Sequence, residues 1–122
     1  MRPGPVPAPR SREVLGRTHP GYLMALNNLA LALKGKGDAA GAEALLREAV
    51  AAKRGAMGGG HPSTLGSVNN LAAALVDLGR RDEAEPLYRE ALAGLRAALG
   101  DRHPDTLSTM SNLAVQVQSH SF

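Results

Sequence analysis

Residues 58–75 read GGGHPSTLGSVNNLAAAL, and residues 100–117 read GDRHPDTLSTMSNLAVQV. A third copy nearer the N-terminus, GRTHPGYLMALNNLALAL, occupies residues 16–33, so the stretch occurs three times at an interval of 42 residues. Between these stretches, GDAAGAEALLREAV at 37–50 is followed at the same interval by GRRDEAEPLYREAL at 79–92. A fixed period of about 20–50 residues is typical of proteins that stack one structural unit on the next. The sequence therefore predicts a repeat protein.

Each unit is predicted to hold two helices. The first helix begins at the His-Pro pair, because proline is preset for the first helical position and gives up only an amide that has no helical partner. Apolar residues then recur every three or four positions, which is the spacing of one helical face. In the first unit, the residues expected to pack against the partner helix are Leu23, Leu26, Leu29, Ala30 and Leu33. The second helix begins near Asp38, and a local bend is expected at Pro86 inside its counterpart in the second unit.

The repeat period also sets the domain boundaries. A single domain is expected over residues 14–118, with units at about 17–58 and 59–100, a partial third unit at 101–118, and a tail at 119–122. The partial unit contains only a first helix, so no second helix covers its apolar residues. This predicts marginal stability or self-association through the open C-terminal end, because stacked units are stabilised by their neighbours.

The charge balance separates the N-terminal segment from the repeats. Residues 1–17 hold four arginines and one glutamate, whereas residues 18–122 hold ten basic and ten acidic residues. Residues 1–13 are rich in proline and arginine and have little apolar surface to bury, so a disordered tail is expected there. There is no cysteine and no apolar run of about 20 residues, and the cytoplasm is the default expectation for location.

The pattern HPxTL…NNLA…G…EAExLYREAL…LGxxHPxTL resembles the tetratricopeptide repeat of the kinesin-light-chain type, and the resemblance covers residues 14–118. It implies an all-α fold, a right-handed α-α superhelical solenoid of about two and a half repeats. The first repeat departs from the pattern at Ala39 and Gly41, and Gly58-Gly59-Gly60 lies before the second His-Pro pair. Because interior glycine lowers helix stability by about 0.5–1 kcal/mol, the first repeat is expected to be less rigid.

Nothing in the sequence predicts an enzyme. The three histidines of the His-Pro pairs lie in different repeats, and neighbouring helix axes are about 8–10 Å apart, whereas zinc ligands lie about 2 Å from the metal. The histidines are therefore interpreted as helix-boundary residues, with no metal site and no cofactor. The glycines at 58–60 are not followed by the Gly-Lys-Ser/Thr of a phosphate loop. No arrangement of serine, histidine and aspartate indicates a nucleophile.

The second asparagine of each pair is predicted to be structural. At about 100° per residue, Asn28 shares a helix face with the small residues Ala25 and Ala32, which would let a neighbouring repeat approach closely. The same position is occupied in the later units by Asn70 and Asn112. These three asparagines are expected to satisfy backbone groups between repeats.

The first asparagine of each pair lies on another face, toward the inner curve of the solenoid. The resemblance implies that this concave surface, lined by first helices, binds extended peptides, and a side-chain amide can both donate to and accept from a main chain. The alternative is that these asparagines are exposed polar residues without a role. Lys34 is the one cation placed in this groove, so any preference for acidic ligands is expected to be weak. The predicted groove residues are Met24, Asn27, Leu31, Lys34, Asn69, Ala73, Val76 and Ser111.

The function favoured by these patterns is a non-enzymatic protein-interaction module that binds a partner protein or peptide through the concave groove, as an adaptor or scaffold. A structural fragment of a longer repeat array, without independent activity, is the first alternative. Nucleic-acid binding through the basic tail is the second, although the repeats offer few aromatic residues for base stacking.

Overall fold

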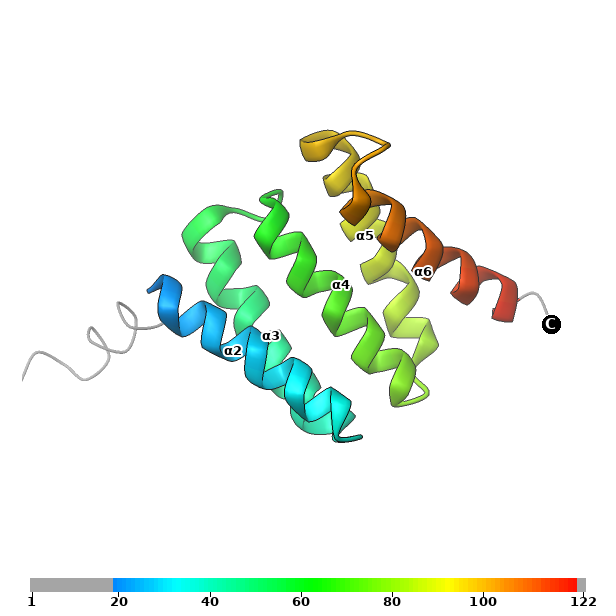
Figure 1. Ribbon diagram of the computed structural model, residues 1–122. Coiled ribbons are helices and arrows are strands. Elements are labelled where there is room, and N and C mark those ends of the chain that lie inside the picture. Colours follow the sequence, from blue (N-terminus) through cyan, green and yellow to red (C-terminus); the bar gives the residue numbers. More distant parts are fainter. Residues whose placement is uncertain (1–18, 121–122) are drawn as a thin grey trace, which may run out of the picture.

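The computed structural model describes residues 19–120, and side chains through residue 118. Within that range the chain forms five α-helices and no strand, arranged as two helical hairpins followed by a single helix (Figure 1). The helices are α2 (Pro20–Gly35), α3 (Ala39–Met57), α4 (Pro62–Asp77), α5 (Arg81–Leu99) and α6 (Pro104–His120). The tail expected at residues 1–13 lies outside the described residues, and α6 extends two residues past the boundary expected at 118.

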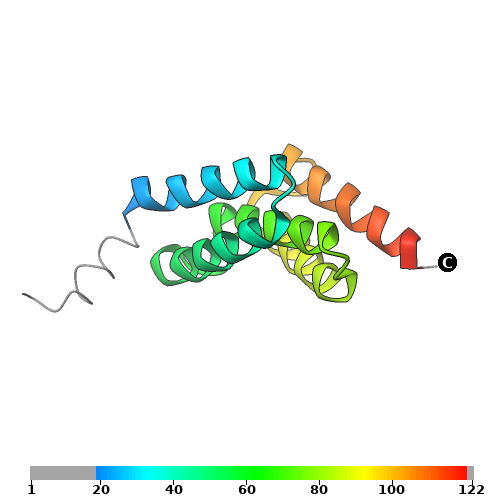
Figure 2. The same cartoon turned by 90° about the horizontal axis from the view of Figure 1, so that it is seen from below.

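The helices form two layers. Each helix packs against the next one in the chain, so that α3 contacts both α2 and α4, and α5 contacts both α4 and α6. The first helices α2, α4 and α6 lie on one side of the molecule (Figure 1). Seen from below, α2 and α6 stand along the upper edge and α4 lies lower between them, so this layer is curved (Figure 2). The all-α helical solenoid implied by the resemblance is confirmed.

Each first helix begins at the proline of its His-Pro pair, as the sequence predicts. The histidine adds a contact that the pattern alone does not reveal, because its imidazole Nδ1 accepts a hydrogen bond from the backbone N–H two residues later. For His19, His61 and His103 the donors are Gly21, Ser63 and Asp105, at 3.0, 3.0 and 3.1 Å. Histidine thus performs the capping role more often filled by serine, threonine, asparagine or aspartate.

The two second helices begin in different ways. The Asp38 carboxylate caps α3 by accepting from the Gly41 N–H at 2.9 Å, which confirms that this helix begins near Asp38. A Cβ at residue 41 would come within 2.5 Å of the Asp38 carboxylate, so glycine leaves room for this cap. In α5 the capping position is Arg80, which makes no side-chain cap and pairs with Glu83 instead. The helix continues through Pro86 without a break.

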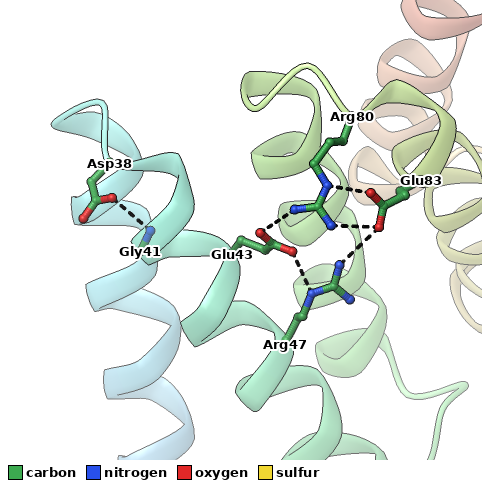
Figure 3. A network of polar contacts seen from close by, with 6 residues as sticks. All are labelled: Asp38, Gly41, Glu43, Arg47, Arg80 and Glu83. Atoms are coloured by element: carbon green, nitrogen blue, oxygen red, sulfur yellow. Dashed lines mark hydrogen bonds and ion pairs between the residues drawn. The ribbon is translucent and has the colours of Figure 1, made fainter.

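A polar network joins the beginnings of the two second helices (Figure 3). The Glu43 carboxylate accepts from Arg47 of its own helix and from Arg80 of the next repeat, each at 2.8 Å. Arg80 also bonds Glu83, and Arg47 lies 3.6 Å from that carboxylate. The hydrogen bond from Arg47 and the contact with Arg80 together lower the pKa of Glu43. The network therefore links neighbouring repeats on the side away from the first helices.

The apolar core lies between the two layers, and one predicted core residue is not part of it. Leu71 of α4 is 3% exposed, whereas Leu29, its equivalent in α2, is 52% exposed. The prediction that Leu29 packs against the partner helix is wrong, because this position packs against the second helix of the preceding repeat. Leu71 borders a small hollow together with Val50 of α3 and Leu87 of α5, so it lies between the second helix of the preceding repeat and that of its own repeat.

Apolar residues of α6 are exposed for a different reason: among the described residues α6 has no second helix after it, whereas α2 has no repeat before it. Leu107 is 47% exposed, although the equivalent Leu65 is buried against the second helix of its own repeat. Val117 is exposed in the same way, and Met110 is half-buried. In the part of the chain that the structure describes, no helix covers this side of α6, as the sequence predicts.

Replacing His61 by alanine should destabilise the fold by about 1 kcal/mol, because the cap on the N–H of Ser63 at the centre of the array is lost. His61→Asn keeps a side-chain acceptor at this position and should retain most of the stability. Urea unfolding followed by circular dichroism measures both variants. Equal stability of His61→Ala and the parent chain would contradict the capping role.

Candidate functional site

Two hollows open between successive first helices. One lies between α2 and α4 and has a volume of about 340 Å³, and the other lies between α4 and α6 with a volume of about 200 Å³. The first is lined by Pro20, Leu23, Met24, Asn27, Lys53, Met57 and Ser63. The second is lined by Pro62, Gly66, Asn69, Asn70, Leu95, Asp105, Ser108 and Thr109.

The two hollows are copies of one site. Each has at its rim the proline that starts a first helix and the first asparagine of the Asn-Asn pair. The residues that differ are informative, because Met24 in the first hollow is replaced by Gly66 in the second, and Lys53 is replaced by Leu95. Stacking the repeats therefore places the same groove position side by side with different side chains.

A ladder of asparagines crosses from each repeat to the next. The Asn70 side-chain amide donates to the Asn27 carboxamide oxygen at 3.3 Å, and Asn112 donates to Asn69 in the same way at 3.4 Å. Asn70 and Asn112 do reach the preceding repeat, but the partner of each is a side chain and not the backbone group that was expected. As a result the oxygen of each groove asparagine is already engaged, and its NH₂ group is the part that remains to meet a ligand.

The ladder ends at both sides of the array. Asn28 is exposed, and among residues 19–118 no repeat precedes α2 and no inter-repeat hydrogen bond of Asn28 is found, so the role expected of Asn28 stays a prediction. In the third unit, Ser111 occupies the groove position and is exposed. The groove thus contains two asparagines, Asn27 and Asn69, held by their neighbours.

The other predicted groove residues lie toward the C-terminal ends of α2 and α4 and do not line the two hollows. Leu31 is exposed, and Ala73 and Val76 are half-buried. Lys34 lies 3.5 Å from the carboxylate of Asp77 across the gap between α2 and α4. The cation expected to face a ligand is therefore already paired within the protein.

Lys53 is the main residue of this face that sequence reasoning missed. Near the end of α3 its charge complements the helix dipole, but its side chain is only 7% exposed and reaches the hollow between α2 and α4. Its Nζ donates to the Ser67 hydroxyl at 2.9 Å and to the Ser63 carbonyl at 3.4 Å. Burial lowers the pKa of Lys53. The 42-residue offset could have revealed its position, because it aligns Lys53 with a leucine of the core, Leu95.

Among the described residues, no group of three or more histidine, cysteine, aspartate or glutamate side chains could hold a metal ion. No helix of the described segment combines the length and apolar character needed to cross a bilayer.

The ladder predicts unequal effects for two substitutions of the same kind. Asn70→Ala removes an inter-repeat hydrogen bond and should lower the free energy of unfolding by about 1 kcal/mol. Asn28→Ala, at the equivalent but exposed position of α2, should change it by less than about 0.5 kcal/mol. Urea titration of the two variants side by side measures the difference, and equal destabilisation would contradict the ladder.

Comparisons with known proteins agree with this architecture. The family model described as tetratricopeptide repeat matches residues 23–63 and 64–105. A comparison with curated proteins finds no significant match.

Among solved structures, the chain is similar to two crystal structures of nearly identical TPR-like repeats from a Podosopora anserina protein assigned as a kinesin light chain. Both are 30% identical to it, with TM-scores of 0.73 and 0.76. The matches cover 86% and 84% of this chain, and this chain spans about half the length of those two, 50% and 49%. The chain belongs to the tetratricopeptide repeat family, and its repeats are of the kinesin-light-chain-like form.

Proposed function

We propose that this protein is a non-enzymatic interaction module that binds an extended segment of a partner protein along the face formed by α2, α4 and α6. Tetratricopeptide repeats generally mediate protein–protein interaction. The observation that carries the proposal is the repeated hollow with a held asparagine at its rim, found once between α2 and α4 and once between α4 and α6.

The asparagines suit recognition of a main chain. Because the oxygens of Asn27 and Asn69 accept hydrogen bonds from the next repeat, each NH₂ group is oriented before a ligand arrives. An oriented donor loses little conformational freedom on binding, which favours affinity. Its natural partner is a peptide carbonyl, a main-chain group that every residue presents whatever its side chain is. The groove would therefore hold a segment in place with little dependence on its sequence.

The spacing of the repeats fits an extended ligand. The Asn27 carboxamide lies 3.3 Å from that of Asn70, the chain neighbour of Asn69. The two groove asparagines therefore lie close enough to contact one extended segment, which rises about 3.3 Å per residue. The side chains between those contacts would face the hollows, whose volumes of about 340 and 200 Å³ suit single side chains.

A second candidate function is supported by the uncovered side of α6. Leu107 and Val117 are exposed at positions where the earlier repeats place a second helix, which favours a segment of a longer array or self-association at this end. The alternative of nucleic-acid binding depends on the basic N-terminal residues, which lie outside the described part of the chain.

The test begins with selection of peptides from a random phage-displayed library on the full 122-residue chain. The affinity of a selected peptide is then measured by fluorescence anisotropy for the parent chain and for the double variant Asn27→Ala/Asn69→Ala. Loss of both donors should weaken binding about tenfold or more, since each hydrogen bond contributes about 0.5–1.5 kcal/mol.

Asn28→Ala is the matched control, because it removes an exposed asparagine of the same helix that does not line either hollow. Its affinity should equal that of the parent chain, and circular dichroism should show all three proteins folded. Peptide binding that is unchanged in the folded double variant would contradict the assignment of the groove.

A further inference from the structure

Two methionines form much of the apolar wall of the hollow between α2 and α4. Met24 of α2 is 64% exposed and Met57 of α3 is 37% exposed, and both line this hollow. Leu23 lines it as well but is buried in the core. At the positions of the two methionines the next repeat has Gly66 and Leu99. The first hollow therefore differs from the second by side chains that are open to oxidation.

Hydrogen peroxide and other hydroperoxides oxidise exposed thioethers. The methionine sulfur gives a lone pair to one peroxide oxygen, the O–O bond breaks, and the products with hydrogen peroxide are a sulfoxide and water. The sulfur loses two electrons and the peroxide gains two, so no further reactant is needed. The chain has four methionines and no cysteine, so its methionines are the sulfur groups that a peroxide can oxidise.

The position of Met24 on α2 decides what its sulfoxide would do. Met24 and Asn27 are three residues apart on one helix, so their side chains are neighbours on its surface. The Asn27 oxygen accepts from Asn70, and among the described residues no group accepts a hydrogen bond from the Asn27 NH₂. Oxidation makes the methionine side chain polar, and its S=O oxygen is an acceptor, as a peptide carbonyl oxygen is. A sulfoxide at Met24 would thus supply from within the protein the acceptor that a ligand otherwise brings to Asn27.

We propose that Met24 is an oxidation site that regulates the groove, in which the sulfoxide oxygen accepts from the Asn27 NH₂ and competes with the peptide for it. This inference rests on the proposed function and adds its regulation. Met57 belongs to α3 and does not share a helix face with Asn27, so the effect is assigned to Met24. The hollow between α4 and α6, which has Gly66 at this position, is unaffected by peroxide.

The experiment uses the full 122-residue chain and a methionine-free peptide selected on it before oxidation. Each protein is treated with hydrogen peroxide, the peroxide is removed, and mass spectrometry of proteolytic fragments locates every added oxygen atom. The affinity for the peptide is measured by fluorescence anisotropy before and after treatment. The ratio of the two dissociation constants is the readout, so the affinity of a variant before treatment does not enter the comparison.

Two leucine variants with equal numbers of methionines form a matched pair. Met57→Leu leaves Met24 as the methionine of the hollow, and Met24→Leu leaves Met57. Peroxide should weaken binding about fivefold or more for the parent chain and for Met57→Leu, because the ligand loses one hydrogen bond. For Met24→Leu the change should stay below about twofold. Met24 should also gain oxygen faster than Met110, which is half-buried on α6.

The outcomes separate this inference from the function on which it rests. Unchanged binding by the parent chain with Met24 fully oxidised, or an equal loss for the two variants, would overturn the regulatory site and leave the groove intact. Slower oxidation of Met24 than of Met110 would overturn it too, as would a loss of helical circular dichroism that accompanies the loss of binding. Failure of the untreated parent chain to select any peptide would overturn the groove itself and its regulation together.

Discussion

The close packing of each helix against both of its neighbours is the interaction on which the rest of the structure depends. Alanines at the helix crossings, including Ala30, Ala42, Ala72 and Ala84, are completely buried and let the helices approach closely. A single hairpin cannot bury both faces of its first helix, so the next repeat is part of its core. This explains why eight residues of α4 are buried and only three of α2.

The same stacking produces the surface that we propose binds a partner. Because like positions fall in rows, Asn70 and Asn112 donate to Asn27 and Asn69 of the preceding repeats and hold those two side chains in place. Equivalent positions of the repeats line both hollows, but the charge differs, because Lys53 lines the first hollow and Leu95 lines the second. A regular scaffold thus presents an irregular set of side chains along the face of the first helices.

The periodic part of the structure could be predicted from the sequence, because the positions of helix starts, turns and buried faces repeat. The His-Pro starts and the cap at Asp38 follow from such local rules. The exposure of Leu29 could not be predicted from its own helix, since it depends on which repeat lies before it. The burial of Lys53 was missed because residue type suggested an exposed helix end, and tertiary packing overrides that preference. The ladder partners of Asn70 and Asn112 needed the relative placement of two helices.

Hydrogen–deuterium exchange, resolved by residue, tests most directly whether neighbour packing determines stability. Amide protection in a stacked array depends on how many neighbours each helix has, so local opening should be easiest at the ends. The account predicts the slowest exchange in α3, α4 and α5, which each have two neighbouring helices, and faster exchange in α2 and α6, which have one. Protection of α6 equal to that of α4, or exchange of all helices at one common rate, would contradict it.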